Sequence, residues 1–351
     1  MTHLWVRAEP RENEDRVGLM PLGAVELIKA GFRITVERSD ARVIPIEDYA
    51  DVGCEIADEG SWPEAPDGAI IFGLKELPED GTPLKHRHIM FGHAFKGQPS
   101  GPAFLKRFLA GNGALYDLEY LVDESGRRVA AFGYWAGFAG AAITLKGWAA
   151  QQVDDTVESL MPYESAEAME DDVRADLNAA FAPRPRALVI GALGRVGAGA
   201  CDLCEAVGVE VTRWDMAETA HGGPFPEVLA HDILLNCILA QPGAPVFVPM
   251  DAIEAGRALR MIGDIACDPA SEYSPIKVYD AVTDWDEPVL TVAENPPLGV
   301  MAIDNLPSLL PAEASADFAA QLLPSLLALG EIKAGVWGRA RAVFDREIAA
   351  L

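Results

Sequence analysis

The feature that most constrains the fold is a continuous run of strand, glycine turn, helix and strand near the middle of the chain. The apolar residues 187–190 lead directly into Gly191, Gly194 and Gly197, and after a helix-like stretch the strand-like residues 209–214 follow. With 32 glycines in the chain, this spacing alone is weak evidence. The stronger evidence is the position of these glycines between a strand and a helix, because that order is typical of a nucleotide-binding unit in a parallel sheet.

Each part of this run has a physical role in binding a dinucleotide. Glycines let the backbone approach a pyrophosphate at a helix N-terminus, where unpaired N–H groups and the helix dipole favour an anion. A carboxylate at the end of the second strand, here Asp215, accepts ribose hydroxyls and repels the 2′-phosphate of NADP. The run therefore predicts NAD as the cofactor, with a tight turn lacking a ligand and a methyltransferase-type site as the alternatives. The expected cofactor-binding residues are Gly191, Gly194, Arg195, Val196, Gly197 and Asp215.

The rest of the chain predicts α/β structure in two domains, which 351 residues are enough to form. Further strands are expected at residues 33–37, 68–74, 88–91, 233–239, 259–266 and 289–293. A helix expected over residues 139–160 could join two lobes, and residues 315–351 are expected to be helical. The predicted fold is a pair of doubly wound, Rossmann-like α/β domains with a cleft between them.

The charge balance excludes two classes of partner. The chain has 28 Lys and Arg against 54 Asp and Glu, a net charge of −26, and such a surface repels nucleic-acid backbones and anionic membranes. The first seven residues show no secretory signal pattern, and no apolar run is long enough to span a membrane. We therefore expect a cytoplasmic protein that binds neither nucleic acid nor membranes.

The cysteines and histidines predict neither a disulfide framework nor a metal site. The five cysteines are an odd number, and the CxxC pair Cys201 and Cys204 lacks the second pair that zinc needs. We interpret them as ordinary thiols on a helix. The six histidines show no HExxH pattern, and His86 and His88 are expected in a solvated loop.

Basic residues are a minority in this acidic chain, and several fall at strand ends or loops of its first third. They are Arg16, Lys75, His93, Lys96, Arg127 and Arg128, with the acids Glu76 and Glu119 beside them. Any one of them could be a solvated surface charge. Together they predict a site at the carboxyl ends of the strands.

Several stretches resemble one known family. FGLKELP (72–78), FGHAFK (91–96), GRRVAAFGYWAGFAGAA (126–142) and DNLPSLLP (304–311) are similar to those of the saccharopine dehydrogenase family of the NAD-dependent, lysine-forming type. That family belongs to the alanine dehydrogenase and transhydrogenase superfamily, and the resemblance runs nearly end to end. It implies a substrate-binding domain of residues 1–131 plus 313–351, an NAD-binding domain of residues 132–312, and, slightly, a monomer.

The resemblance also implies a role for each matching residue. Lys75 and His93 match the two acid–base groups, and Glu76 and Glu119 match acids that adjust the charge of the site. Lys96 and Asp304 match further polar groups that line the site. Arg16 and Arg128 match the arginines that bind substrate carboxylates, with Phe132 beside them. The family turn commonly reads GRCG where this chain has GRVG, so Val196 puts thiol-linked redox behaviour in doubt but not hydride transfer.

The activity implied is the interconversion of saccharopine, NAD and water with L-lysine, 2-oxoglutarate and NADH, by hydride transfer and imine hydrolysis. Within the superfamily, an alanine dehydrogenase or a carboxyalkyl-amino-acid synthase would share the two lobes and the glycine turn. A catalytically silent NAD-binding subunit is a third reading, which the presence of both Lys75 and His93 disfavours.

Overall fold

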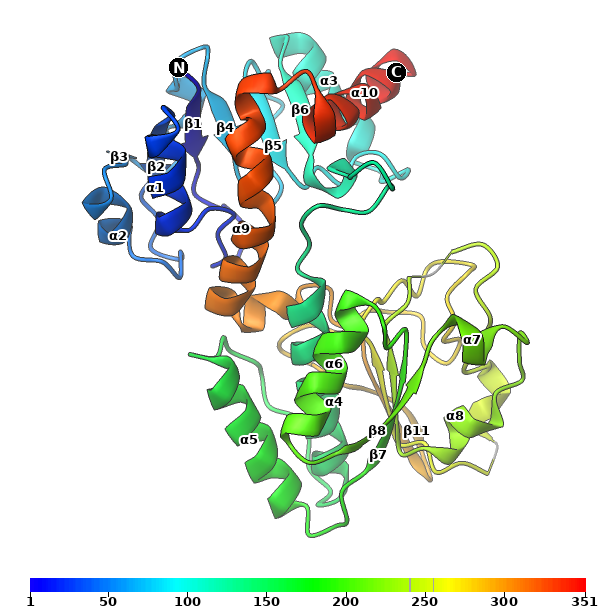
Figure 1. Ribbon diagram of the computed structural model, residues 1–351. Helices are drawn as coiled ribbons and strands as arrows, with labels where there is room; N and C mark the ends of the chain where they lie inside the picture. Colours follow the sequence, from blue (N-terminus) through cyan, green and yellow to red (C-terminus); the bar gives the residue numbers. More distant parts are fainter. Residues whose placement is uncertain (240, 255) are drawn as a thin grey trace. The chain divides into compact units, whose positions relative to one another are not determined.

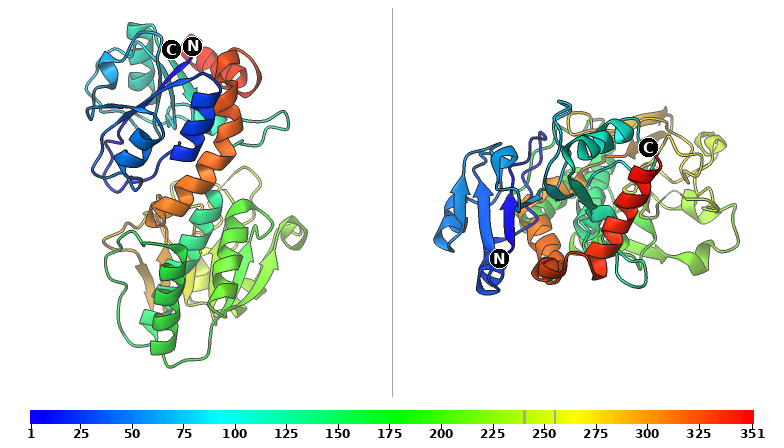
Figure 2. Two further views of the ribbon diagram at one scale, coloured as in Figure 1. Left: turned by 60° about the vertical axis from the view of Figure 1, so that its left-hand side comes forward. Right: turned by 90° about the horizontal axis from the view of Figure 1, so that it is seen from above.

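The computed structural model describes residues 1–239, 241–254 and 256–351, and the chain divides into two compact units. Unit 1 comprises Met1–Ala131 and Ala314–Leu351, and unit 2 comprises Phe132–Glu313. Within the described residues, each unit is built around its own six-stranded sheet, with helices on both faces (Figures 1 and 2). The expected α/β class with mainly parallel, Rossmann-type sheets is confirmed.

The sheet of unit 1 is parallel throughout, in the order β3-β2-β1-β4-β5-β6. Its strands are β1 His3–Val6, β2 Arg33–Glu37, β3 Glu55–Ala57, β4 Ile70–Phe72, β5 Arg87–Met90 and β6 Ala114–Asp117. The chain starts in the middle of the sheet at β1, builds outward to β3, and then returns to place β4 on the other side of β1. In sheets of this kind, the carboxyl ends of the strands at such a reversal, here β1 and β4, are the usual binding place.

The helices of unit 1 come from both ends of the chain, which lie in this unit (Figure 1). They are α1 Pro21–Lys29, α2 Ile46–Asp51, α3 Gly101–Gly111, α9 Pro311–Leu327, whose first three residues belong to unit 2, and α10 Gly335–Ala349. Phe318 of α9 packs its ring 6.0 Å from that of Phe91, and Trp337 of α10 lies 6.2 Å from Tyr116. The C-terminal helices therefore complete the core of the N-terminal sheet.

Unit 2 has the strand order β8-β7-β9-β10-β12-β11, and its edge strand β11 runs antiparallel to β12. Its strands are β7 Arg186–Ile190, β8 Glu210–Trp214, β9 Ile233–Asn236, β10 Met261–Asp264, β11 Leu290–Glu294 and β12 Pro297–Met301. Its helices are α4 Gly133–Gln151, α5 Ala166–Ala179, α6 Arg195–Ala206, α7 Met216–Thr219 and α8 Pro226–Ala230. Figure 1 shows α4, α5 and α6 on one face of this sheet and α7 and α8 on the other. Short 3₁₀ helices in the two units are η1 Trp62–Glu64, η2 Leu118–Tyr120, η3 Met250–Ile253, η4 Leu306–Leu309 and η5 Ala328–Glu331.

Helices α4 and α6 pack backbone to backbone, which explains the small residues of the GYWAGFAGAA stretch. A Cβ on Gly137 would lie 1.8 Å from the carbonyl oxygen of Val196, and one on Gly199 would lie 1.9 Å from that of Tyr134. Larger residues would force the helices apart. The expectation of one helix over residues 139–160 that joins two lobes is wrong, because α4 ends at Gln151 and lies wholly within unit 2.

The expectation of a solvated loop for His86 and His88 is also wrong, because each is only 1% exposed. His88 lies in β5, and its ring meets Trp62 and Phe108 edge-on, with ring centroids 5.2 and 5.5 Å away. Among the described residues, neither ring nitrogen of His88 has a hydrogen-bond partner. Burial, together with the charge of Arg7, lowers the pKa of His88 well below its usual value.

Cys201 and Cys204 are free thiols buried in α6, and burial raises the pKa of both. Across the described residues, every helix is too short or too polar to cross a bilayer.

Acidification should destabilise unit 1 through His88. The unfolded chain binds a proton at this histidine near pH 6.5 and the folded chain does not, so the free energy of unfolding falls as the pH drops below about 6.5, by at most about 1.4 kcal/mol per pH unit. A His88→Leu variant, which has a similar side-chain volume, should lose less stability between pH 7 and 5. Urea unfolding followed by hydrogen exchange of unit 1 peptides measures this difference, and equal pH dependence in the two proteins would contradict it.

Candidate functional site

Three candidate residues of unit 1 follow three neighbouring strands. Lys75 comes three residues after the end of β4, His93 three residues after β5, and Glu119 two residues after β6. The strands are parallel and adjacent, with Phe72 paired to Ile89 and Met90 to Asp117. Their carboxyl ends therefore present Lys75, His93 and Glu119 at one edge of the sheet.

Glu76 connects His93 to an arginine that the sequence analysis did not single out. The Oε1 atom of Glu76 lies 3.7 Å from Nε2 of His93 and 3.8 Å from a terminal nitrogen of Arg11. His93 has a φ of +45°, in the left-handed region that costs a non-glycine residue about 1 kcal/mol or more. A strained backbone at a candidate acid–base residue indicates that the position of the His93 side chain matters for function.

Glu119 is held between two cations. It accepts a hydrogen bond of 2.6 Å from Nζ of Lys96 and another from the guanidinium of Arg128. Burial alone would raise its pKa, but the hydrogen bond from Lys96 and the charge of Arg128 outweigh burial, so the pKa of Glu119 is lowered. Glu119 therefore stays ionised and offsets part of the positive charge of this edge.

Asp117, which sequence reasoning missed, lies under the His93 loop. It ends β6 and is 1% exposed, and burial raises its pKa to about 6. Its Oδ1 accepts the N–H of Glu119 at 2.9 Å, and a Cβ on Gly92 would come within 3.1 Å of its Oδ2. Gly92 thus lets the loop pass closely over the carboxylate. No signal in the sequence separates this buried acid from the many exposed ones.

A cavity of about 310 Å³ adjoins this edge of unit 1. Its walls are both apolar and charged, and they include Glu76, Leu77, Glu79, His93, Phe104 and Arg107. The size suits a small molecule, because ligand pockets begin at about 300 Å³. Two of the candidate residues therefore face a space that can hold part of a substrate.

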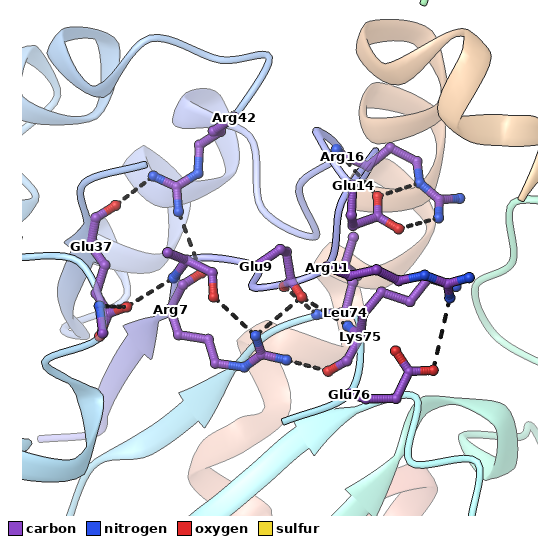
Figure 3. A network of polar contacts seen from close by, with 12 residues as sticks. Arg7, Glu9, Arg11, Glu14, Arg16, Glu37, Arg42, Leu74, Lys75 and Glu76 are labelled. Carbon is purple, nitrogen blue, oxygen red and sulfur yellow. Dashed lines mark hydrogen bonds and ion pairs between the residues drawn. The ribbon is translucent and has the colours of Figure 1, made fainter. Parts of the chain in front are cut away.

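The two arginines expected to bind carboxylates differ in their surroundings. Arg16 is 4% exposed, and its Nε and Nη2 bind both oxygens of the buried Glu14, at 2.7 and 2.5 Å (Figure 3). Arg128 is about one-third exposed and contacts Glu119. Arg16 therefore already has a carboxylate on one edge of its guanidinium, whereas Arg128 is accessible from solvent.

In unit 2, the glycine turn has the form that a dinucleotide requires. Gly191 has a φ of +85°, and a Cβ on Gly197 would lie 2.1 Å from the carbonyl oxygen of Gly191, so both positions need glycine. Helix α6 begins after Gly194, which has no side chain to cap its first N–H groups. A Cβ on Gly194 would meet only the oxygen of Gly191, at 3.3 Å, which leaves the outer side of the turn open. These residues fit a pyrophosphate at the helix N-terminus.

Asp215 follows β8 and links that strand to the turn. Its carboxylate accepts the N–H of Leu193 at 3.1 Å and that of Met216 at 2.8 Å, where it caps α7. Asp215 is half-buried beside the glycine turn, the position from which such an acid binds ribose hydroxyls. Arg195 and Val196 form the first turn of α6, with Arg195 exposed and Val196 half-buried.

Known proteins share this sequence and fold. Residues 5–139 match the family described as alanine dehydrogenase/PNT, N-terminal domain. Saccharopine dehydrogenase (NAD⁺, L-lysine-forming) of Yarrowia lipolytica is 45% identical over 98% of this chain and 97% of its own. Its namesake in Schizosaccharomyces pombe is 43% identical over 99% of each chain. This chain belongs to the lysine-forming saccharopine dehydrogenase family.

A solved L-alanine dehydrogenase structure has the same fold, with a TM-score of 0.66 and 15% identity over 98% of this chain and 94% of its own. The residues expected from the saccharopine dehydrogenase pattern fall in both units. Unit 1 brings together Glu76 with His93, and Lys96 with Glu119 and Arg128. Phe132, just before α4, and the exposed Asp304, after β12, lie in unit 2.

Asp215→Asn should weaken NADH binding and reduce discrimination against NADPH. The amide keeps the shape but loses the charge that binds ribose hydroxyls and repels a 2′-phosphate, and one charge-assisted bond of about 1.5–3 kcal/mol corresponds to about 10- to 100-fold in affinity. The dissociation constants of both cofactors can be measured by fluorescence. Glu218→Gln, on the neighbouring capping residue, is the matched control and should change NADH affinity less than about twofold. Equal affinity of the wild type for NADPH and NADH would refute this assignment.

Proposed function

We propose that this chain interconverts saccharopine, NAD⁺ and water with L-lysine, 2-oxoglutarate and NADH. The observation that carries the proposal is the placement of Lys75 and His93 after neighbouring strands, with Glu76 and the Glu119 cluster beside them. The near full-length relationship to lysine-forming saccharopine dehydrogenases supports it.

The chemistry requires groups that both accept and donate protons. Saccharopine joins the ε-nitrogen of lysine to the α-carbon of a glutamate unit, and its oxidation requires that the secondary amine lose its proton. Bound NAD⁺ supplies the hydride acceptor. The imine of the substrate is then hydrated, and the resulting carbinolamine collapses to lysine and 2-oxoglutarate. Lys75 and His93 take and return the protons in these steps, and such help contributes about 10²- to 10⁴-fold in rate.

Glu76 lies between a candidate acid–base group and a cation. One of its carboxylate oxygens is 3.7 Å from His93 and 3.8 Å from Arg11. Three cations face the two carboxylates of this edge, Arg11 at Glu76 and Lys96 and Arg128 at Glu119. In a chain of net charge −26, this local positive excess attracts a substrate that carries three carboxylates.

Substrate comparison tests the proposal. NADH oxidation should be rapid with 2-oxoglutarate plus L-lysine. It should be at least about 100-fold slower with pyruvate plus ammonia or with 2-oxoglutarate plus ornithine, because losing a two-pronged carboxylate contact or misplacing the amine costs about 2.7 kcal/mol or more.

Lys75→Met and His93→Gln should each lower kcat about 10²-fold or more with NADH affinity near normal, because both residues lie in unit 1. Full activity of the double variant would show that neither residue is needed for proton transfer. In the substrate comparison, a preference for pyruvate and ammonia would identify the chain as an alanine dehydrogenase instead.

Arg128 and Arg16 should respond differently to replacement by alanine. Arg128→Ala removes an accessible guanidinium, so the KM for 2-oxoglutarate should rise about 10- to 100-fold while the KM for lysine changes less. Arg16→Ala leaves Glu14 buried without its partner, so the free energy of unfolding should fall by about 3–5 kcal/mol. Steady-state kinetics and urea unfolding of both variants measure this. A normal KM in Arg128→Ala, or unchanged stability in Arg16→Ala, would contradict the distinction.

A further inference from the structure

The segment that carries Lys75 leaves the sheet with main-chain groups that no strand can pair. After β4 ends at Phe72, the N–H of Gly73 still bonds the carbonyl of Ile89 at 3.0 Å, and the carbonyl of Leu74 accepts the N–H of Phe91 at 3.0 Å. The N–H groups of Leu74 and Lys75 and the carbonyl of Lys75 lie beyond this ladder. Buried main-chain groups of this kind need another partner.

Two side chains from the loop after β1 supply that partner. The carboxylate of Glu9 accepts the N–H of Leu74 at 2.6 Å and that of Lys75 at 2.9 Å, one on each oxygen. Arg7 donates to Glu9 at 3.1 Å and also to the carbonyl oxygen of Lys75. Figure 3 shows the two side chains reaching the same short stretch of backbone.

The Arg7–Glu9 pair is largely buried and closely fitted. The exposed fractions of its side chains are 1% and 9%. A Cβ on Gly73 would lie 2.4–2.7 Å from atoms of the Arg7 guanidinium, so the arginine lies directly against the backbone where it leaves the sheet. A buried ion pair contributes little net stability compared with an apolar pair of the same size. Its geometry, with three bonds to residues 74 and 75, therefore calls for another explanation.

We propose that Arg7 and Glu9 are positioning residues, which hold the main chain of Lys75 so that its side chain starts from one fixed place and direction. This inference rests on the proposed function, in which Lys75 transfers protons. Neither Arg7 nor Glu9 acts on the substrate in this account. A displacement of about 1 Å in a reacting group can cost about 10²-fold in rate, so a clamp on the lysine backbone acts on kcat rather than on cofactor binding.

The charge of Glu9 has a second effect. Replacing it by glutamine removes a negative charge near Lys75 and leaves Arg7 positive, which disfavours the ammonium form of the lysine. The pKa of Lys75 should fall, and the limb of the kcat–pH profile that belongs to this lysine should move to lower pH. A role in folding alone would not move that limb.

The test compares Glu9→Gln with a matched control in the same sheet. Arg33 and Glu55 form a similar Arg–Glu pair at the amino ends of β2 and β3, but this pair is exposed. In the full-length protein, kcat should fall about 10- to 100-fold in Glu9→Gln and less than about twofold in Glu55→Gln, with NADH affinity unchanged in both. Arg7→Lys keeps the positive charge but cannot contact both Glu9 and the carbonyl of Lys75 as the guanidinium does. The kcat of this variant should therefore fall without a shift in the pH profile.

Hydrogen exchange of the amides of Leu74 and Lys75 gives a readout that needs no activity. These amides should exchange at least about tenfold faster in Glu9→Gln than in the wild type, while those of the rest of β4 and β5 do not change. Faster exchange with a normal kcat and pH profile would overturn the positioning role, and so would unchanged exchange. Absence of activity with lysine and 2-oxoglutarate in the wild type would instead overturn the proposed function, and exchange would then still decide whether the clamp exists.

Discussion

The structure depends on how the chain leaves the carboxyl ends of parallel strands, where N–H and C=O groups lose their ladder partners. In unit 1 the freed N–H groups donate to acids that are wholly or largely buried. Glu9 accepts those of Leu74 and Lys75, and Asp117 accepts that of Glu119, while Arg7 donates to the carbonyl of Lys75. Glu37, at the end of β2, accepts the N–H groups of Ala8 and Gly60. The same edge carries Lys75 and His93, so the candidate site stands on loops that buried side chains hold in place.

Each unit has an acid at the carboxyl end of the second strand of its sheet, but the two acids differ in burial and in what they bind. Glu37 in unit 1 is fully buried and bonds the loop after β1, which contains no glycine between Arg7 and Val17. Asp215 in unit 2 is half-buried beside a turn with glycines at 191, 194 and 197. One topology therefore gives a packed loop in unit 1 and an open turn with an uncapped helix end in unit 2, and only the second fits a pyrophosphate.

Local patterns in the sequence were enough to predict elements whose residues face a core in a regular period. Strands β2, β7 and β8 lie within one residue of the predicted bounds, because their apolar runs end at clear breaks. The burial of His88 and of the Arg7–Glu9 pair could not be predicted, because it depends on residues such as Trp62 and on a loop 65 positions or more along the chain. Charged residues are usually exposed, so the sequence alone predicts that Arg7 and Glu9 lie on the surface, whereas the fold buries them against the main chain of Lys75.

The central claim is that the chain forms or cleaves the bond between the ε-nitrogen of lysine and the α-carbon of 2-oxoglutarate. Mass spectrometry of the product tests it most directly, with lysine carrying ¹⁵N at the ε-amino group, unlabelled 2-oxoglutarate and NADH deuterated at the transferred position. The account predicts saccharopine that retains the ¹⁵N and gains one deuterium at the α-carbon of its glutamate unit. With pyruvate and ammonia added to the same mixture, deuterated alanine or glutamate and no saccharopine would contradict it.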